Sequence, residues 1–360
     1  MIDVTTMSPG GQTAADIARQ LSSFLAAARQ SLELALYDLN LSGEAEGLVN
    51  GALEDAIRRG VRVRLVFNAD SAGPIPVPPP PQATPDEIET LPVETRAIPG
   101  IPDLMHHKFV VRDGSAVWTG SANWTDDSWT KQENVLLTID SHDIAKSYIR
   151  DFEQLWETAN VAVTGDVEPV AVMVGDATVR AWFTPFRGEA LSHRIASRLG
   201  KAQRRIRVCS PVITSGPILG TLAEIASDRR VDLAGVVDLT QSENVLHQWR
   251  LNNNAPWKTP ALERLLEYGG FTGKRSTPWT PGSTHDFMHA KVTIADNTAF
   301  VGSFNLSHSG ELNAENVLEI EDEPIANRLA AFVEDIHGRY PPVRFPELDG
   351  PGAARAETPT

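Results

Sequence analysis

Residues 105–114 read Met-His-His-Lys-Phe-Val-Val-Arg-Asp-Gly, and residues 288–296 read Met-His-Ala-Lys-Val-Thr-Ile-Ala-Asp. Both stretches contain a histidine, one further residue, a lysine, four residues and an aspartate. The corresponding residues of the two copies are all 183 positions apart (289 − 106, 291 − 108 and 296 − 113). A single His-x-Lys arises by chance in many chains, but two full copies at one constant spacing indicate an internal duplication.

Two shorter elements follow each copy in the same order. Gly-Ser-x-Asn stands at residues 120–123 and again at 302–305, and Glu-Asn-Val-Leu begins at Glu133 and again at Glu315. We therefore expect the two halves of the chain to fold alike and to contribute matching sets of side chains.

The apolar residues after each lysine, Phe109 to Val111 in the first copy and Val292 and Ile294 in the second, predict that each motif lies on a β-strand ending in a turn. Side chains alternate between the faces of a strand, so His106 and Lys108 are expected to point the same way, as are His289 and Lys291. An imidazole and an ammonium about 7 Å apart along a strand suit a bound phosphate. The lysine neutralises the oxygens while the ring reaches phosphorus or the leaving oxygen.

The trailing elements add hydrogen-bonding groups to the same place. The serine and asparagine of each Gly-Ser-x-Asn share a strand face and can donate to the same anion. These residues are Ser121, Asn123, Ser303 and Asn305. Each glutamate, Glu133 or Glu315, can accept the second ring N–H of a histidine, which would fix the tautomer and orientation of that ring.

The paired His-x-Lys-x4-Asp motif resembles the signature of the phospholipase D superfamily and matches it in both halves of the chain. That family includes phospholipases, cardiolipin synthases, metal-independent nucleases and a DNA-repair phosphodiesterase. The resemblance implies an enzyme that hydrolyses phosphodiesters without a metal or cofactor. It also implies one active site where the two halves meet, so that a monomer is sufficient.

In the reaction implied by the resemblance, one neutral histidine attacks phosphorus to form a covalent phosphohistidine, and a second, protonated histidine supplies a proton to the leaving oxygen. By resemblance, His106 is expected to be the nucleophile and His289 the acid. The groups expected to stabilise the nonbridging oxygens are Lys108, Lys291, Asn123 and Asn305. Asp113 and Asp296 are expected to hold the turns after the strands rather than to take part in the chemistry.

Helical and strand periodicities alternate along the chain, which predicts an α/β fold. We expect two similar sandwiched mixed β-sheet domains with flanking helices, related as a pseudo-two-fold internal duplication and covering residues 13–160 and 177–341. Residues 1–12 are predicted to be frayed, and residues 349–360 to form a disordered tail. The proline-rich residues 71–92 are predicted to be a surface insertion or, alternatively, a loop that shapes the active cleft.

Composition restricts the setting of the protein. The net charge of −15 argues against a surface that binds polyanions everywhere, although a local basic channel remains compatible with it. The single cysteine, Cys209, excludes an internal disulfide or a cysteine-based zinc site and fits a reducing compartment. Neither a membrane span nor an N-terminal signal is expected, so the predicted location is the cytoplasm.

Several other residues admit two interpretations. His107 is predicted to pack on the opposite strand face, since its counterpart is Ala290. His285, Asp286 and His308 could suggest a metal site with His289, but coincidence is the favoured interpretation. The tryptophans beside the motifs could be core residues, stacking platforms for bases or anchors at a lipid surface. They are Trp124, Trp129, Trp257 and Trp279.

The substrate is the least determined property. Met-His-His-Lys-Phe and Gly-Ser-Ala-Asn-Trp-Thr are similar to the small nuclease branch of the superfamily and its mitochondrial relatives, so nucleic acid, DNA or RNA, is the favoured substrate. Phospholipid headgroups are the alternative, by hydrolysis or transphosphatidylation. A non-catalytic scaffold that binds anions or a partner is a weaker alternative, because every motif position is intact in both copies.

Overall fold

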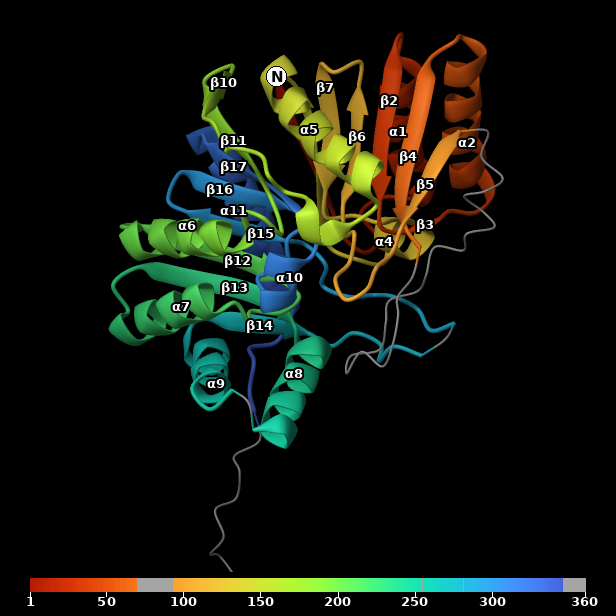
Figure 1. Cartoon of the computed structure of the whole chain (residues 1–360). Helices are drawn as coiled ribbons and strands as arrows, with labels where there is room; N and C mark the ends of the chain where they lie inside the picture. The colour runs from red at the N-terminus through yellow and green to blue at the C-terminus, as the bar shows by residue number, and fades with distance from the viewer. Residues whose placement is uncertain (70–92, 254, 281, 346–360) are drawn as a thin grey trace, which may run out of the picture.

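The computed structural model describes residues 1–69, 93–253, 255–280 and 282–345. The proline-rich stretch at 71–92 and the tail at 349–360 lie outside these residues. Each half of the described chain builds one mixed β-sheet with helices on its faces (Figure 1). The predicted α/β class and internal duplication are confirmed.

The first sheet has seven strands in the order β1-β9-β7-β6-β2-β4-β5. Its strands are β1 (Ile2–Met7), β2 (Ser31–Leu36), β4 (Arg62–Asn68), β5 (Glu94–Ile98), β6 (Lys108–Arg112), β7 (Ala116–Gly120) and β9 (Asn134–Asp140). Strands β2, β4 and β5 are parallel neighbours, and the other pairs are antiparallel. The remaining elements of this half are α1 (Ala14–Ala26), β3 (Leu39–Asn40), α2 (Gly43–Arg58), β8 (Trp124–Thr125), α4 (Asp126–Thr130) and α5 (His142–Thr158).

The prediction that residues 1–12 are frayed is wrong. Strand β1 pairs antiparallel with β9 from Ile2, opposite Ile139, to Met7, opposite Asn134. The pairing covers the edge of β9, whose backbone groups would otherwise lack strand partners. Val4 and Met7 are also buried against the core, so the first half begins at the N-terminal strand rather than at residue 13.

The second sheet has eight strands in the order β10-β11-β17-β16-β15-β12-β13-β14. Its strands are β10 (Val172–Val174), β11 (Ala177–Phe183), β12 (Arg205–Ser210), β13 (Asp232–Asp238), β14 (Phe271–Lys274), β15 (Val292–Ala295), β16 (Thr298–Gly302) and β17 (Asn316–Glu321). The helices are η1 (Val161–Val163), α6 (Gly188–Lys201), α7 (Gly216–Asp228), α8 (Leu239–Asn252), α9 (Lys258–Tyr268), α10 (His308–Leu312) and α11 (Glu323–Arg339). Lys274 ends β14.

One apolar core lies between the two sheets and contains residues of both halves, including Phe109, Tyr148 and Phe183. Helices α5 and α11 contribute their buried faces to this central core. Helices α1 and α2 cover the outer face of the first sheet, and α6, α7 and α9 that of the second (Figure 1). The two sheets therefore face each other across the central core.

The segment that precedes β6 and the segment that precedes β15 each contact the opposite half of the chain. Met105 forms a parallel bridge with Ala314, and Met288 forms one with Glu133. The motif strands begin later than expected, at Lys108 and Val292. Both motif histidines consequently lie just ahead of their strands, in segments held by the opposite half of the chain.

Candidate active site

The two motifs bring four functional side chains together. His106, His289, Lys108 and Lys291 are each at most 8% exposed. Besides burial, both lysines lower the pKa of each histidine ring, and His106 also lowers the pKa of His289. One chain therefore supplies both motifs to a single buried cluster.

The lysines have the same local geometry in both halves. Lys108 Nζ donates to the backbone oxygen of His106 over 2.6 Å, and Lys291 Nζ donates to that of His289 over 2.8 Å. The ammonium of Lys108 also lies 4.7 Å from the centre of the Tyr37 ring. Each lysine folds back on its own motif, which places its charge beside the neighbouring imidazole.

Burial and mutual repulsion lower the pKa values of these two histidines and two lysines. Burial lowers the pKa of both His106 and His289 well below the usual value, and the two lysines lower them further. Burial lowers the pKa of Lys108 to about 7, although Glu315 and Asp38 oppose the shift. The pKa of Lys291 is also well below its usual range because of burial and Lys108. The cluster is therefore suited to receive an anion.

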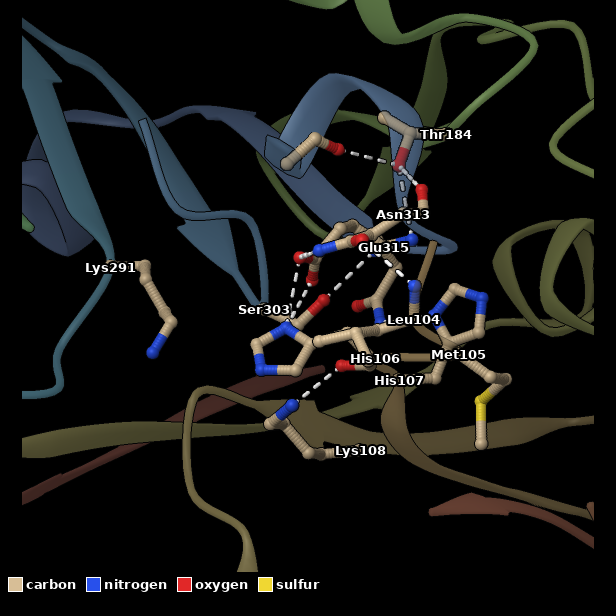
Figure 2. Close-up of polar contacts among 12 residues, drawn as sticks. Leu104, Met105, His106, His107, Lys108, Thr184, Lys291, Ser303, Asn313 and Glu315 are labelled. Atoms are coloured by element: carbon tan, nitrogen blue, oxygen red, sulfur yellow. Dashed lines mark hydrogen bonds and ion pairs between the residues drawn. The ribbon is translucent and has the colours of Figure 1, made fainter. Parts of the chain in front are cut away.

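The ring of His106 rests on a carboxylate of the opposite half. Its Nδ1 lies 2.8 and 2.9 Å from the two oxygens of Glu315, and the other ring nitrogen points away from them (Figure 2). Burial raises the pKa of Glu315 to about 7, although Lys108 and a hydrogen bond from Ser303 lower it. An ionised Glu315 accepts the Nδ1 proton, which leaves Nε2 with its lone pair free.

The ring of His289 rests on an amide instead. Its Nδ1 lies 3.1 Å from Asn134 Oδ1, which also accepts a hydrogen bond from Ser121. Asn134 Nδ2 donates to the backbone oxygen of Ser128 over 3.0 Å. That contact fixes which end of the amide is the acceptor, so His289 donates its Nδ1 proton to a neutral oxygen.

The carboxylate of Glu133 does not hold the ring of His289, contrary to what the repeated Glu-Asn-Val-Leu predicts, because Asn134 has that place. Its buried carboxylate accepts from Lys274 Nζ over 2.8 Å and from the Tyr340 hydroxyl. The backbone oxygen of Glu133 accepts the His289 N–H, whereas Ala314 has that role toward His106.

A shift of one residue between the repeats explains this difference. Gly302 pairs with Val317, and Gly120 pairs with Leu136. The glycines are 182 positions apart (302 − 120), but their partners are only 181 apart (317 − 136). In space, Glu315 therefore corresponds to Asn134, and Ala314 corresponds to Glu133.

The other motif residues occupy supporting places. Asp113 and Asp296 have left-handed backbones (φ 52° and 53°), and each accepts hydrogen bonds from three consecutive backbone N–H groups. Both side chains hold the start of a neighbouring strand and do not face the cluster of histidines. Asn123 and Asn305 are half-buried, and their amide oxygens have no partner among the described residues. These two amides thus retain hydrogen-bonding capacity for a ligand.

The residues with two interpretations mostly belong to the framework. His107 is fully buried; its Nε2 lies 2.8 Å from Asp151 Oδ2, and its Nδ1 contacts the side-chain amide of Asn316. Trp124 and Trp129 are 2% and 1% exposed, so they are core residues, whereas Trp257 is 50% exposed. His285 stacks on Phe287, Asp286 accepts from Thr277, and His308 pairs with Glu311. Within residues 1–69, 93–253, 255–280 and 282–345, no three histidine, cysteine or carboxylate side chains gather as metal ligands would.

The family described as "Cardiolipin synthase, PLD-like domain" matches residues 21–156 and 195–336. Mitochondrial cardiolipin hydrolase of Xenopus laevis is 36% identical over 134 residues, which cover 37% of this chain and 58% of that protein. The human protein of the same name is 32% identical over 158 residues, covering 42% and 54%. The chain therefore spans little more than half the length of these curated relatives.

The solved structure of a phosphatidylserine synthase from Haemophilus influenzae superposes with a TM-score of 0.64 and covers 94% of this chain and 86% of that one. The two sequences are 13% identical, so this likeness shows the fold alone. The family match covers well over half of the chain and includes both motifs. The chain therefore carries two PLD-like domains and belongs to the phospholipase D superfamily.

Proposed function

We propose that this chain is a metal-independent phosphodiester hydrolase in which His106 attacks phosphorus and His289 protonates the leaving oxygen. The observation that carries the proposal is the convergence of two imidazoles and two lysine side chains, one pair from each half, in one buried place. Figure 2 shows Nε2 of His106 directed away from Glu315, toward the side on which Lys108 and Lys291 lie. A phosphate there would meet a nucleophile and two cations.

The reaction has two displacements at phosphorus. In the first, Nε2 of His106 bonds to phosphorus, and the bond to the leaving oxygen breaks as His289 gives that oxygen a proton. In the second, a water oxygen bonds to phosphorus, the N–P bond breaks, and His289 takes up the proton of the water. The nonbridging oxygens are stabilised by Lys108, Lys291, Asn123 and Asn305.

The two ring acceptors support this division of roles. The carboxylate of Glu315 makes His106 more electron-rich and stabilises the positive charge that the ring acquires on attack. The neutral amide of Asn134 orients His289 without adding negative charge, so a protonated His289 releases its proton more readily. We infer that the negative charge of the bound phosphodiester protonates His289 by raising its pKa.

For the substrate, we place phospholipid headgroups ahead of nucleic acid. The curated relatives are named for cardiolipin, and the net charge of −15 opposes general attraction of a polyanion. Trp124 and Trp129 are buried in the core and are not available to stack on bases. The similarity of the first motif to the nuclease branch keeps nucleic acid as the second candidate.

Exposed apolar side chains near the His106 segment also favour a lipid substrate. Ile101, Phe186 and Leu312 are 52%, 62% and 41% exposed. Their segments are joined through Asn313, whose side chain accepts from the Leu104 N–H and whose backbone oxygen accepts from Thr184. Exposed apolar groups on neighbouring segments are compatible with a surface that binds apolar partners or membranes.

The described part of the chain contains no helix with the length and apolarity of a membrane span. The exposed apolar groups would accordingly contact a lipid surface from outside the bilayer. We propose the cytoplasm as the location and a monomer as the working unit, because one chain supplies both motifs.

The test compares substrates side by side in EDTA: vesicles containing cardiolipin, vesicles of phosphatidylcholine, plasmid, single-stranded DNA and RNA. We expect release of a phospholipid headgroup, unchanged by the chelator, with nucleic acids cleaved more slowly. Faster cleavage of DNA or RNA than of either lipid would reverse the substrate order. Loss of all activity in EDTA, restored by Mg²⁺ or Zn²⁺, would contradict metal independence.

A further inference from the structure

A buried charged network lies behind His289, and the proposed reaction does not use it. Lys274 Nζ donates to Glu133 Oε2 over 2.8 Å and to the backbone oxygen of Lys131 over 3.1 Å, so it joins the second half to the first. The Tyr340 hydroxyl donates to the other oxygen of Glu133. Glu133 is fully buried and Lys274 is 7% exposed. Such a pair must be fully satisfied to be tolerated.

This network holds the backbone at His289. The backbone oxygen of Glu133 accepts the His289 N–H over 3.2 Å, and Asp238 Oδ2 accepts the Met288 N–H over 3.0 Å. Asp238 pairs with Lys274 in the register of β13 and β14. The position of the His289 ring therefore depends on charged groups that lie outside the cluster of histidines.

At His106, the corresponding backbone N–H groups donate to neutral acceptors. The Met105 N–H donates to Asn68 Oδ1, and the His106 N–H donates to the backbone oxygen of Ala314. The carboxylate at this site, Glu315 of the second half, contacts the ring of His106 itself. The carboxylate near His106, Glu315, thus contacts the ring, whereas the residue near His289, Glu133, contacts the backbone N–H of His289 and has its carboxylate paired with Lys274.

We propose that Lys274 and Tyr340 are positioning residues: Lys274 neutralises Glu133 behind His289, Tyr340 holds the same carboxylate by a hydrogen bond, and together they reserve His289 for proton transfer. The inference rests on the proposed function, because it concerns the proton donor of that reaction. Among the described residues, the neutral amide of Asn134 is the side chain that holds Nδ1 of His289, and Lys274 offsets the charge of the neighbouring Glu133. A ring without an adjacent negative charge gives up its proton more readily.

The surroundings make Lys274 the decisive cation. The titratable groups that face His289 are Lys108, Lys291 and His106. Those that face Glu133, Tyr340 and Lys274 are Asp238, Cys209 and Arg339. Within the described residues, Lys274 is the cation in contact with the carboxylate of Glu133. Its removal would leave a buried negative charge on the residue next to Asn134, whose amide holds the His289 ring, and on the residue whose backbone oxygen accepts the His289 N–H.

The experiment measures the pKa of His289 by NMR titration of its ring protons without substrate, using the loss of signal in His289→Gln for assignment. In Lys274→Met we expect this pKa to rise by about one unit, a tenfold change in the protonation equilibrium. We also expect kcat to fall about tenfold at unchanged KM, as for a weaker proton donor. Glu133→Ala/Lys274→Met, which imitates Ala314, should return both values toward those of the unmodified protein.

Lys258→Met is the matched control, because Lys258 donates to the Thr214 backbone oxygen, away from Glu133; it should change neither value. If Lys274→Met does not fold, Tyr340→Phe should raise the pKa of His289 by a smaller amount. An unchanged pKa of His289 in the variants that fold would overturn the inference. The expected titration with no turnover of any phosphodiester would instead reject the proposed function and leave the electrostatic role of Lys274 intact.

Discussion

The two halves of the molecule carry the same motif but place their negative charge differently. In the first half the motif histidine, His106, rests on the carboxylate of Glu315. In the second half His289 rests on the amide of Asn134, while Glu133 pairs with Lys274. A duplication produces two equal histidines, yet a two-step displacement needs one nucleophile and one acid. The one-residue shift between the repeats provides that inequality.

The largest expected effect comes from removing either ring. His106→Ala should reduce turnover to background, since no covalent intermediate can form. His289→Ala should lower turnover about 10³-fold for substrates with poor leaving groups and less for activated esters, which need no proton. Steady-state rates measure both changes, with the exposed His193→Ala as control. More than a few per cent of activity in His106→Ala would contradict the shared site.

Exchanging the ring acceptor should have the next largest effect. Glu315→Gln gives His106 a neutral partner like that of His289, and loss of a charged hydrogen bond worth about 1.5–3 kcal/mol corresponds to roughly a 10- to 100-fold lower kcat. Glu315 must be ionised to accept the Nδ1 proton, and its pKa is about 7. The rate should therefore fall as the pH drops through that value, and this acidic limb should vanish in the variant. An identical pH profile in both proteins would contradict the role of Glu315.

The protonation of Lys108 should have a smaller effect, which is on the binding of an anion. Burial lowers the pKa of Lys108 to about 7, so it gains its charge as the pH falls through that value. Inorganic phosphate should raise the melting temperature by a few degrees at pH 6 and less at pH 9, because binding to the folded state stabilises it. Lys108→Met should remove this pH dependence. A phosphate effect of equal size at both pH values would oppose the assignment.

The sequence alone predicts most of this arrangement, because the constant spacing of the motifs identifies both histidines and both lysines. It does not predict the partner of His289. The repeated Glu-Asn-Val-Leu aligns Glu133 with Glu315, but the strands place Asn134 there. The helix caps Ser141 and Asp322, which are 181 positions apart, already contained that shift.

Contacts between segments distant in sequence were also beyond prediction. Nothing near Lys274 or Tyr340 indicates that both reach Glu133 across the halves, because such contacts depend on how the sheets are placed. Strand β1 was missed because its pairing with β9 is visible only once the edge of β9 is known.

The smallest expected effect concerns the two aspartates, for which the halves should behave alike. Asp113→Ala and Asp296→Ala each remove an acceptor of three backbone N–H groups and place alanine at a positive φ. Each should lower the free energy of unfolding by about 2 kcal/mol without changing kcat at a temperature where the variant is folded. Denaturant melts and rate measurements check both points. A loss of kcat in a folded variant would assign the aspartate a part in the chemistry.

The central claim is that His106, whose ring contacts the carboxylate of Glu315, is the nucleophile. A brief reaction quenched in alkali, where phosphohistidine survives, followed by digestion and mass spectrometry, locates the adduct directly. The account predicts substrate-derived phosphate on His106, with more of it in His289→Ala when the leaving group is activated, because the second step then lacks its base. An adduct on His289 would contradict the assignment of roles, and no adduct together with inversion at phosphorus would contradict the covalent route.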